Sequence, residues 1–187
     1  MPVFKRLLLA IALLACAVVG AQWLLARNGI VTPFRMPAVL PPPPLTRPYG
    51  MAPAAFDGFK RACYRAKVQP RRIGQTIGDH PKSVGYHKRD GTLEYRGQKL
   101  DYSAAVDIGT QDLTRAQINK LLEELTRQGF AAFYREKGKW KGGEHIHAIY
   151  APLQMKPQLR GQLSEWARKR RREKKPVYGW QKRLDLD

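Results

Sequence analysis

Cysteine is scarce in this chain of 187 residues. The two cysteines are Cys16 and Cys63, and Cys16 falls inside an apolar N-terminal segment, which leaves Cys63 without a disulfide partner. A disulfide framework is therefore excluded, and the stability of the folded part has to come from a packed core or a metal ion. A lone thiol such as Cys63 is also more typical of a small buried residue than of a nucleophile.

Acidic residues are scarce as well. There are 15 Asp and Glu against 34 Lys and Arg, a formal net charge of +19, and basic residues dominate the stretch 156–187. A field of this sign attracts polyanions. For an exported chain these are anionic lipid headgroups and cell-wall polymer, whereas nucleic-acid binding has only the charge in its favour and no recognised motif, so we do not expect it. The alternative is that the basic stretch is a solvated helix face and tail.

Long apolar runs are absent after residue 26. Before it, Lys5 and Arg6 precede an apolar stretch over 7–26, of about 20 residues, which is enough to cross the hydrocarbon core as an uncleaved anchor. A secretory signal cleaved after Ala21 and a lipoprotein-like Cys16 are the other two interpretations. All three export the rest of the chain, so we expect a location at the bacterial inner membrane facing the periplasm or cell exterior, or release to the periplasm if the signal is cleaved.

Proline marks the next boundary. The run Pro41–Pro44 lies in a proline-rich stretch that favours extended polyproline II geometry and no packed core. The sequence therefore predicts four segments. They are a signal anchor or signal peptide over 1–27, a proline-rich linker over 28–54, a folded domain over 55–155, and a basic C-terminal helix and tail over 156–187.

The clearest element is a helix over 114–128. Thr114 and Gln117 are spaced as a capping box, apolar residues follow at helical spacing, and Gly129 supplies the stop. Weaker patterns predict further helices over 54–67 and 157–175.

Strands are expected over 83–87 and 102–108, with Asp90-Gly91 as the turn of a hairpin, and over 130–135 and 145–150, which pair as a second hairpin. This order is typical of an α+β fold with a small antiparallel sheet and helices on one side, preceded by an N-terminal hydrophobic helix.

The segment Glu144-His145-Ile146-His147 carries the chemistry. Side chains two apart on a strand share a face, so His145 and His147 point the same way. Two imidazoles on one rigid strand suit zinc, for which Asp107 and His87 are the further ligand candidates. An aspartate in an apolar strand has to be paired, hydrogen-bonded or metal-bound. Glu144, at the start of the strand, is placed to take a proton from a metal-bound water.

These residues give the chain a resemblance to a known family. Ser103-Ala104-Ala105-Val106-Asp107-Ile108, then the helix 114–128, an aromatic strand and Glu144-His145-Ile146-His147 resemble the zinc D-Ala-D-Ala carboxypeptidases and dipeptidases of the M15 type. Those enzymes share the fold of phage endolysins and of the hedgehog signalling domain. The resemblance covers about residues 83–155.

The resemblance implies a set of roles. The zinc ligands would be His87, Asp107 and His147, with Glu144 as catalytic base and His145 lining the site or contacting the oxyanion. The substrate arginine of the family would be Arg71 or Arg72.

Two positions depart from the family pattern. The family histidine lies seven residues before the aspartate, where this chain has Leu100, and a hairpin inserted over 88–101 would bring His87 to that place instead. Ser103 stands where the family has glycine.

The function expected from all of this is a membrane-tethered, monomeric zinc peptidase acting on peptidoglycan stem peptides, of the D,D-carboxypeptidase or L,D-endopeptidase type. Its partners would be the wall peptide or another anionic wall polymer, and the membrane through its N-terminal helix. The alternative is a non-catalytic exported module on the same fold that binds cell wall or a partner protein.

Overall fold

A computed structural model describes residues 45–78, 85–139 and 142–186. The predicted signal or anchor over 1–27 and most of the proline-rich linker lie outside these ranges. Within them, no helix has the length and apolar character needed to cross a membrane.

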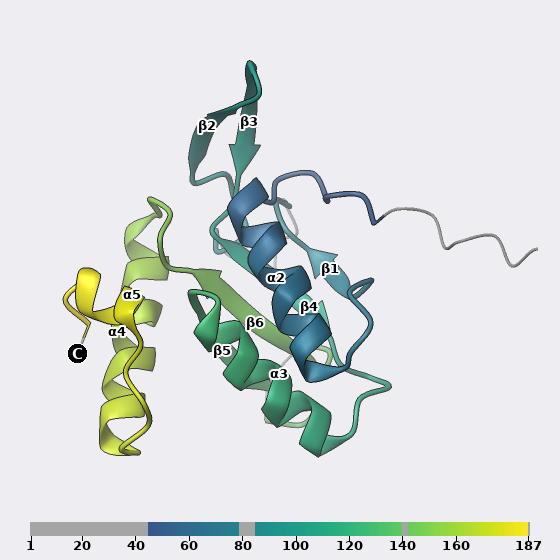
Figure 1. Ribbon diagram of the computed structural model, residues 1–187, viewed down its shortest axis with the longest axis vertical. Coiled ribbons are helices and arrows are strands. Elements are labelled where there is room, and N and C mark those ends of the chain that lie inside the picture. The colour runs from purple at the N-terminus through teal and green to yellow at the C-terminus, as the bar shows by residue number, and fades with distance from the viewer. Residues whose placement is uncertain (1–44, 79–84, 140–141, 187) are drawn as a thin grey trace, which may run out of the picture. The chain divides into compact units, whose positions relative to one another are not determined.

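The described chain is α+β, with two elements before a β-hairpin and six after it (Figure 1). In chain order the elements are α2 (Pro53–Ala66), β1 (Ile73–Gln75), β2 (Gly91–Tyr95), β3 (Gln98–Tyr102), β4 (Ala105–Gly109), α3 (Arg115–Arg127), β5 (Phe130–Arg135), β6 (His145–Tyr150), α4 (Pro157–Arg172) and α5 (Gly179–Arg183).

The main sheet is antiparallel, with the strand order β1-β4-β6-β5. β5 and β6 form the hairpin expected from the sequence, with Phe130 opposite Tyr150 and Arg135 opposite His145. The central strands β4 and β6 pair so that Asp107 stands opposite His147. Since directly opposed residues of an antiparallel pair share a face, this register already brings two of the predicted ligands together.

One face of the sheet is covered by α2 and α3, which pack on the apolar side chains of alternate strand positions. Val106, Ile108, Ile146 and Ala148 enter the same core as Phe59 of α2 and Leu121 and Leu125 of α3. The capping box of α3 is present, since Thr114 accepts from the Gln117 backbone while the Gln117 side chain accepts from Thr114. Gly129 has φ +97°, the left-handed conformation that ends the helix.

The expectation of helices on one side only is wrong, because α4 packs on part of the opposite face. Leu159, Leu163 and Trp166 of α4 join Ala131 and Ile149 of the sheet in a second core, to which α5 adds Trp180. The basic C-terminal segment is therefore packed into the domain through one face of α4. The sheet positions that α4 leaves uncovered carry the polar residues discussed below.

The hairpin over 88–101 exists, as β2 and β3, but its turn differs from the one expected. The strands close at Arg96-Gly97, both with positive φ, 51° and 74°, and Gly91 lies inside β2. Two consecutive positive φ values are typical of a two-residue hairpin turn. Asp90 instead accepts hydrogen bonds from the Ala104 and Lys156 backbone.

Two further boundaries shift. The folded region begins before residue 55, because Met51 and Ala52 are buried in the first core. Residues 85–88 form a turn, so the part of the expected strand 83–87 that the structure describes is not a strand; residues 83 and 84 lie outside the described ranges.

Candidate metal centre

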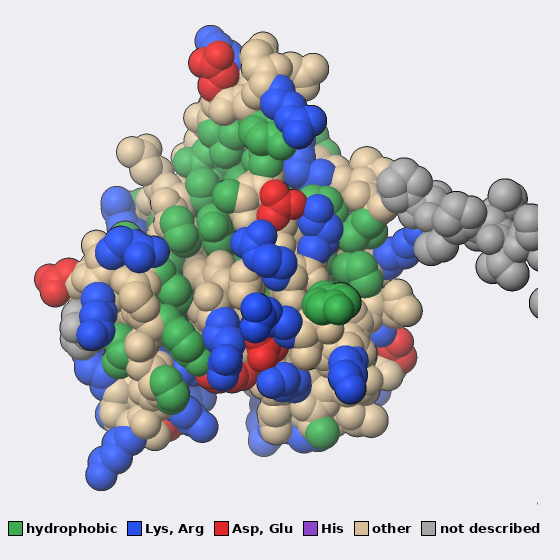
Figure 2. Space-filling view, in the orientation of Figure 1, with side chains coloured by type: hydrophobic (Ala, Val, Ile, Leu, Met, Phe, Trp, Pro, Cys, Tyr) green, Lys and Arg blue, Asp and Glu red, His purple; other side chains and the backbone are tan. Residues whose placement is uncertain are grey.

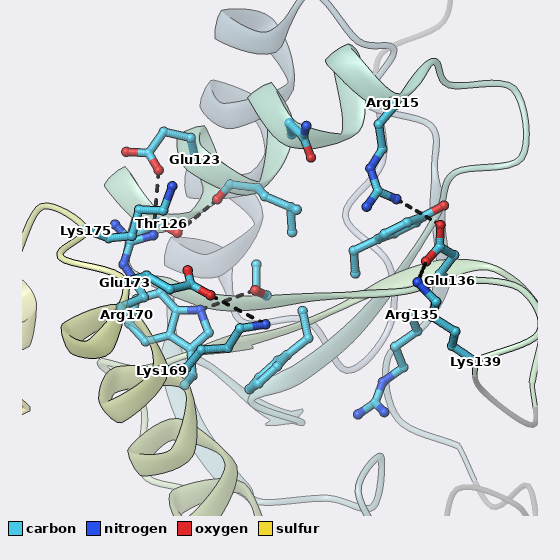
Figure 3. A pocket seen from close by; sticks show the side chains of 16 residues that line it. Arg115, Glu123, Thr126, Arg135, Glu136, Lys139, Lys169, Arg170, Glu173 and Lys175 are labelled. Atoms are coloured by element: carbon cyan, nitrogen blue, oxygen red, sulfur yellow. Dashed lines mark hydrogen bonds and ion pairs between the residues drawn. The ribbon is translucent and has the colours of Figure 1, made fainter.

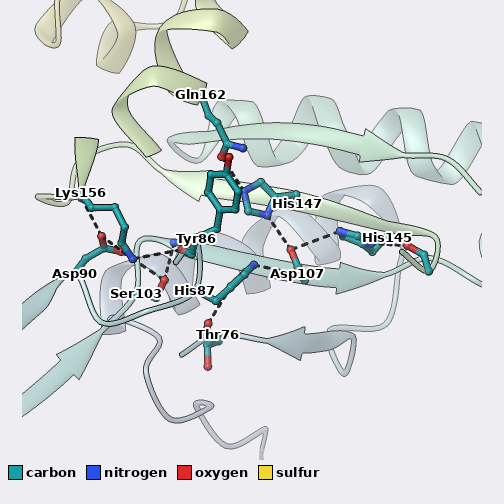
Figure 4. Close-up of polar contacts among 12 residues, drawn as sticks. Thr76, Tyr86, His87, Asp90, Ser103, Asp107, His145, His147, Lys156 and Gln162 are labelled. Carbon is teal, nitrogen blue, oxygen red and sulfur yellow. Dashed lines mark hydrogen bonds and ion pairs between the residues drawn. The ribbon is translucent and has the colours of Figure 1, made fainter. Parts of the chain in front are cut away.

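Three of the predicted ligands converge on the sheet face that α4 leaves open (Figure 4). His87, Asp107 and His147 each offer a ligand atom, and these atoms all lie within 4.8 Å of one another. Asp107 and His147 come from the paired central strands β4 and β6. His87 comes from the turn that precedes β2. The group can hold a metal ion.

An ion-paired lysine holds the turn that carries His87. The Nζ of Lys156 donates to the backbone carbonyls of Tyr86 and Lys88, the residues on either side of His87, at 3.4 and 2.5 Å. It also lies 3.2 Å from the carboxylate of Asp90, whose side chain is fully buried. Lys156 directly precedes α4, so this pair ties the His87 turn to the base of α4.

The hydrogen bond of His87 fixes which of its nitrogens faces the cluster. Its Nδ1 lies 2.9 Å from the carbonyl of Thr76, which can only accept, so Nδ1 carries the hydrogen. Its other nitrogen, Nε2, faces a lone pair of Asp107 Oδ2 at 3.2 Å. Two lone pairs at this distance repel unless a cation, either a proton or a metal ion, lies between them.

His147 shows the same arrangement. Its Nε2 lies 3.1 Å from the side-chain amide of Gln162, and its Nδ1 lies 2.8 Å from Asp107 Oδ1. Each imidazole therefore has one nitrogen on an orienting partner and directs the other at the carboxylate. Metal-ligating histidines are commonly oriented in this way by a carbonyl or carboxylate on the distal nitrogen.

Electrostatics favour the forms that bind metal. Burial lowers the pKa of His147, and Arg135 and His87 act in the same direction against the opposing effect of Asp107, so the ring is neutral at pH 7. Burial would raise the pKa of Asp107, but hydrogen bonds from His147 and His87 outweigh it and hold that pKa well below its usual range. Neutral imidazole and ionised carboxylate are the ligand forms of these groups.

A cavity of about 460 Å³ opens onto the cluster. His145 lines it with its Nε2 3.7 Å from Asp107 Oδ1, while its Nδ1 donates to the Gly143 carbonyl at 2.6 Å. Arg135, opposite His145 in the β5–β6 register, is the one arginine among the described residues that line this cavity. The centre thus has a third imidazole and a cation beside its three candidate ligands.

Glu144 lines the same cavity, but its carboxylate is engaged elsewhere. Its Oε1 accepts from the Tyr134 hydroxyl at 2.6 Å and lies 3.3 Å from Thr110 Oγ1. The structure therefore holds Glu144 at the rim of the site through Tyr134 rather than against the ligand cluster.

Arg72 does not reach the cavity. Its guanidinium pairs with both carboxylate oxygens of Asp112, one at 2.7 Å, and Arg72 is absent from the cavity lining. The Asp112 hydrogen bond raises the pKa of Arg72 further. The predicted role of Arg72 as the substrate arginine is thus not supported by its position, and the arginine that lies beside the cluster is Arg135.

Sequence reasoning missed Gln162 and Arg135, although both leave a signal. Gln162 falls between Leu159 and Leu163 within the apolar stripe of α4, where a polar residue needs a buried partner. Arg135 is found by extending the β5–β6 hairpin register until it reaches the strand position opposite His145. No sequence pattern indicates that the Thr76 carbonyl orients the His87 ring.

Comparison with protein-family models, with curated proteins and with solved structures finds no match to this chain. The case for function therefore rests on the site itself.

Proposed function

We propose that this chain is a zinc peptidase that acts on peptidoglycan stem peptides, as a D,D-carboxypeptidase or L,D-endopeptidase, held at the bacterial inner membrane by its apolar segment 7–26. The observation that supports it most is the convergence of two imidazole nitrogens on the Asp107 carboxylate, His87 Nε2 at 3.2 Å and His147 Nδ1 at 2.8 Å. A metal ion at the centre of this arrangement would bind all three groups.

The donor set fits zinc. Two imidazole nitrogens and one carboxylate oxygen are the ligand types of catalytic zinc sites, which keep one position open. His87, Asp107 and His147 would hold the ion, which supplies Lewis-acid chemistry and a lowered pKa for a bound water. Thr76 and Gln162 orient the two rings, and the Tyr86 and Phe133 rings stand 6.3 Å from His147, shielding that side from water.

The remaining cavity residues suit a peptide substrate. Arg135 can pair with a terminal carboxylate or with the scissile carbonyl oxygen, as charge-assisted hydrogen bonds to a guanidinium are strong and directional. His145, anchored by the Gly143 carbonyl, directs Nε2 into the cavity, where it can hydrogen-bond a developing oxyanion. Glu144 would accept and return the proton as general base, within reach of the cavity that it lines.

One observation favours a non-catalytic binding module as the second candidate. The Glu144 carboxylate is already bonded to Tyr134 and Thr110, and a base has to exchange one of those bonds for the attacking water. In a module of this kind, the histidine cluster would hold a structural ion, and the cavity would bind wall peptide without cleaving it.

Metal content and peptide cleavage test the proposal on the full-length chain. We expect about one zinc per chain by mass spectrometry of the wild type and its loss in His147→Ala. The control is His80→Ala, at the histidine that the sequence places outside the proposed ligand set, and this variant should retain the zinc. Muropeptides should be shortened by the wild type and about 10²–10⁴-fold more slowly by Glu144→Gln. A wild type that binds no metal after zinc titration would overturn the proposal, and bound zinc without cleavage would favour the binding module.

A further inference from the structure

A second cavity, of about 650 Å³, lies along β5 between α3 and α4 (Figure 3). β5 is an edge strand of the main sheet, so this groove exposes one side of its backbone. Six of the side chains that line the groove are basic, and they are Arg115, Arg135, Lys139, Lys169, Arg170 and Lys175. In Figure 2 the hollow between α3 and α4 has Lys and Arg side chains on both of its sides.

The acidic residues of the groove do not neutralise it. Among the residues that the structure describes, three acidic ones line it, and each already faces a cation of the groove. Glu136 lies 3.3 Å from Arg115 and 2.7 Å from Lys139, Glu123 lies 3.6 Å from Arg170, and Glu173 lies 3.9 Å from Lys169. Basic side chains exceed acidic ones by three, so the groove attracts an anionic ligand.

The backbone of β5 adds a second kind of contact. The Ala132 carbonyl accepts from Trp166 Nε1 at 3.2 Å, so this carbonyl points away from β6. Because backbone groups alternate in direction along a strand, the N–H and carbonyl of Tyr134 point to the same outer side. An extended peptide laid beside β5 can pair with the N–H and carbonyl of Tyr134 as an added strand, while the Ala132 carbonyl stays with Trp166.

Two other classes of polyanion fit less well. Single-stranded nucleic acid relies on base stacking, but Trp166 is 4% exposed and Arg170 lies over its ring at 5.1 Å, while Arg115 lies over Tyr134 at 4.7 Å. A membrane surface cannot enter a groove enclosed by two helices. A narrow chain with backbone hydrogen-bonding groups and carboxylates suits it better.

We propose that the groove is a subsite for an acidic peptide bound in extended conformation as an additional strand on β5. Its carboxylates would alternate between the α3 side and the α4 side, since successive side chains of a strand point to opposite faces. Arg135 lines both this groove and the metal cavity, so the two lie on either side of one side chain. If the subsite leads substrate to the metal centre, that role rests on the proposed function. The binding of an acidic peptide to the groove does not depend on it.

Fluorescence anisotropy of a fluorescein-labelled hexaglutamate peptide tests this on the full-length chain, after EDTA treatment to prevent cleavage. We expect the double variant Lys169→Gln/Lys175→Gln to weaken binding roughly tenfold at low salt, as two carboxylate contacts are lost. The matched control Arg168→Gln/Arg172→Gln removes the same charge from exposed positions of α4 that do not line the groove, and should weaken binding less than about threefold. Equal losses in both pairs would overturn the proposal.

Backbone pairing is tested with modified peptides. Hexaglutamate N-methylated at alternate residues, in either register, should lose most of its affinity, since methylation removes the donors that pair with β5. Unchanged binding of the methylated peptides would overturn the added strand, and tighter binding of a single-stranded oligonucleotide of matched length would overturn the ligand class. His147→Ala should bind hexaglutamate as the wild type does, so the subsite can stand even if the zinc peptidase proposal fails.

Discussion

Cys63 is a residue of α2, and its side chain is fully buried in the first core. Burial raises the pKa of its thiol to about 12, against a smaller opposing effect of Arg72. An unfolded thiol titrates near pH 8.5, so above that pH the unfolded state releases a proton that the folded state keeps. The free energy of unfolding should therefore fall by up to about 1.4 kcal/mol per pH unit between roughly pH 8.5 and 12 because of this one residue.

Urea unfolding of the wild type and of Cys63→Ala at pH 7 and pH 10 measures this effect. The alanine variant starts less stable but should lose about 2 kcal/mol less than the wild type over that interval. Ellman's reagent at pH 8 should react with Cys63 only after urea is added. Rapid reaction of the folded protein would show that the thiol reaches solvent.

Gln162 acts on the metal centre through His147. Its side-chain amide lies 3.1 Å from His147 Nε2 and keeps Nδ1 directed at the cluster. Removal of such an orienting acceptor typically costs 10- to 100-fold in metal affinity. Competition with a zinc chelator should therefore give about that loss for Gln162→Leu. Gln158→Leu, at an exposed position one turn earlier on α4, is the control, and an equal loss there would assign the effect to the helix.

At the scale of elements, the turn that carries His87 depends on Lys156. Removing Lys156 leaves the Tyr86 and Lys88 carbonyls without this donor and leaves Asp90, whose side chain is fully buried, without its cation. Breaking a buried ion pair from one side costs about 3 kcal/mol. We expect Lys156→Met to lower the free energy of unfolding by about that amount and to weaken metal binding at least tenfold.

A second comparison separates the two effects of Lys156. Lys156→Arg keeps the charge and should recover part of the metal affinity, whereas a purely packing role of the side chain would leave arginine no better than methionine. Metal binding by Lys156→Met that matches the wild type would show that other contacts hold the turn.

Elements with local determinants could be predicted from the sequence. The α3 helix has its capping box, its apolar face and its C-terminal glycine in one continuous stretch, and the β5–β6 hairpin has two adjacent strands. The sheet face on which α4 packs could not be predicted. An apolar stripe indicates that a helix is packed against another element, but it does not identify that element. The turn of the β2–β3 hairpin was predicted at Asp90-Gly91, because aspartate and glycine favour the positive φ of such turns. The turn lies instead at Arg96-Gly97, where an arginine adopts the positive φ.

In the site, too, the residues on regular strands could be predicted and those on the irregular turn could not. Asp107, His145 and His147 lie on regular strands, where alternation and register place them on one face. The same alternation puts Glu144 on the side of Ile146, where Tyr134 holds it, and this consequence was overlooked. His87 and the Thr76 carbonyl meet across an irregular turn. Its conformation depends on Lys156, which is distant in the chain, and on the neighbouring Asp90 that pairs with it.

At the scale of the whole molecule, the basic C-terminal segment is part of the folded domain. Trp180 of α5 is 6% exposed, stacks on Trp166 with ring centroids 5.5 Å apart, and donates its indole hydrogen to the Thr126 carbonyl at 2.8 Å. These contacts join α5, α4 and the end of α3. A solvated tail, which the charge of 156–187 alone would suggest, would make none of them.

Replacement of Trp180 measures how far this packing stabilises the domain. Truncating a buried tryptophan to alanine costs about 3–5 kcal/mol, so Trp180→Ala should lower the free energy of unfolding by that amount in a urea titration followed by circular dichroism. Tyr64→Ala, at a side chain that is 85% exposed, should change it by less than about 0.5 kcal/mol. If Trp180→Ala cost no more than Tyr64→Ala, α5 would be an appendage. The Trp166 wall of the groove beside β5 would then have to be held by α4 alone.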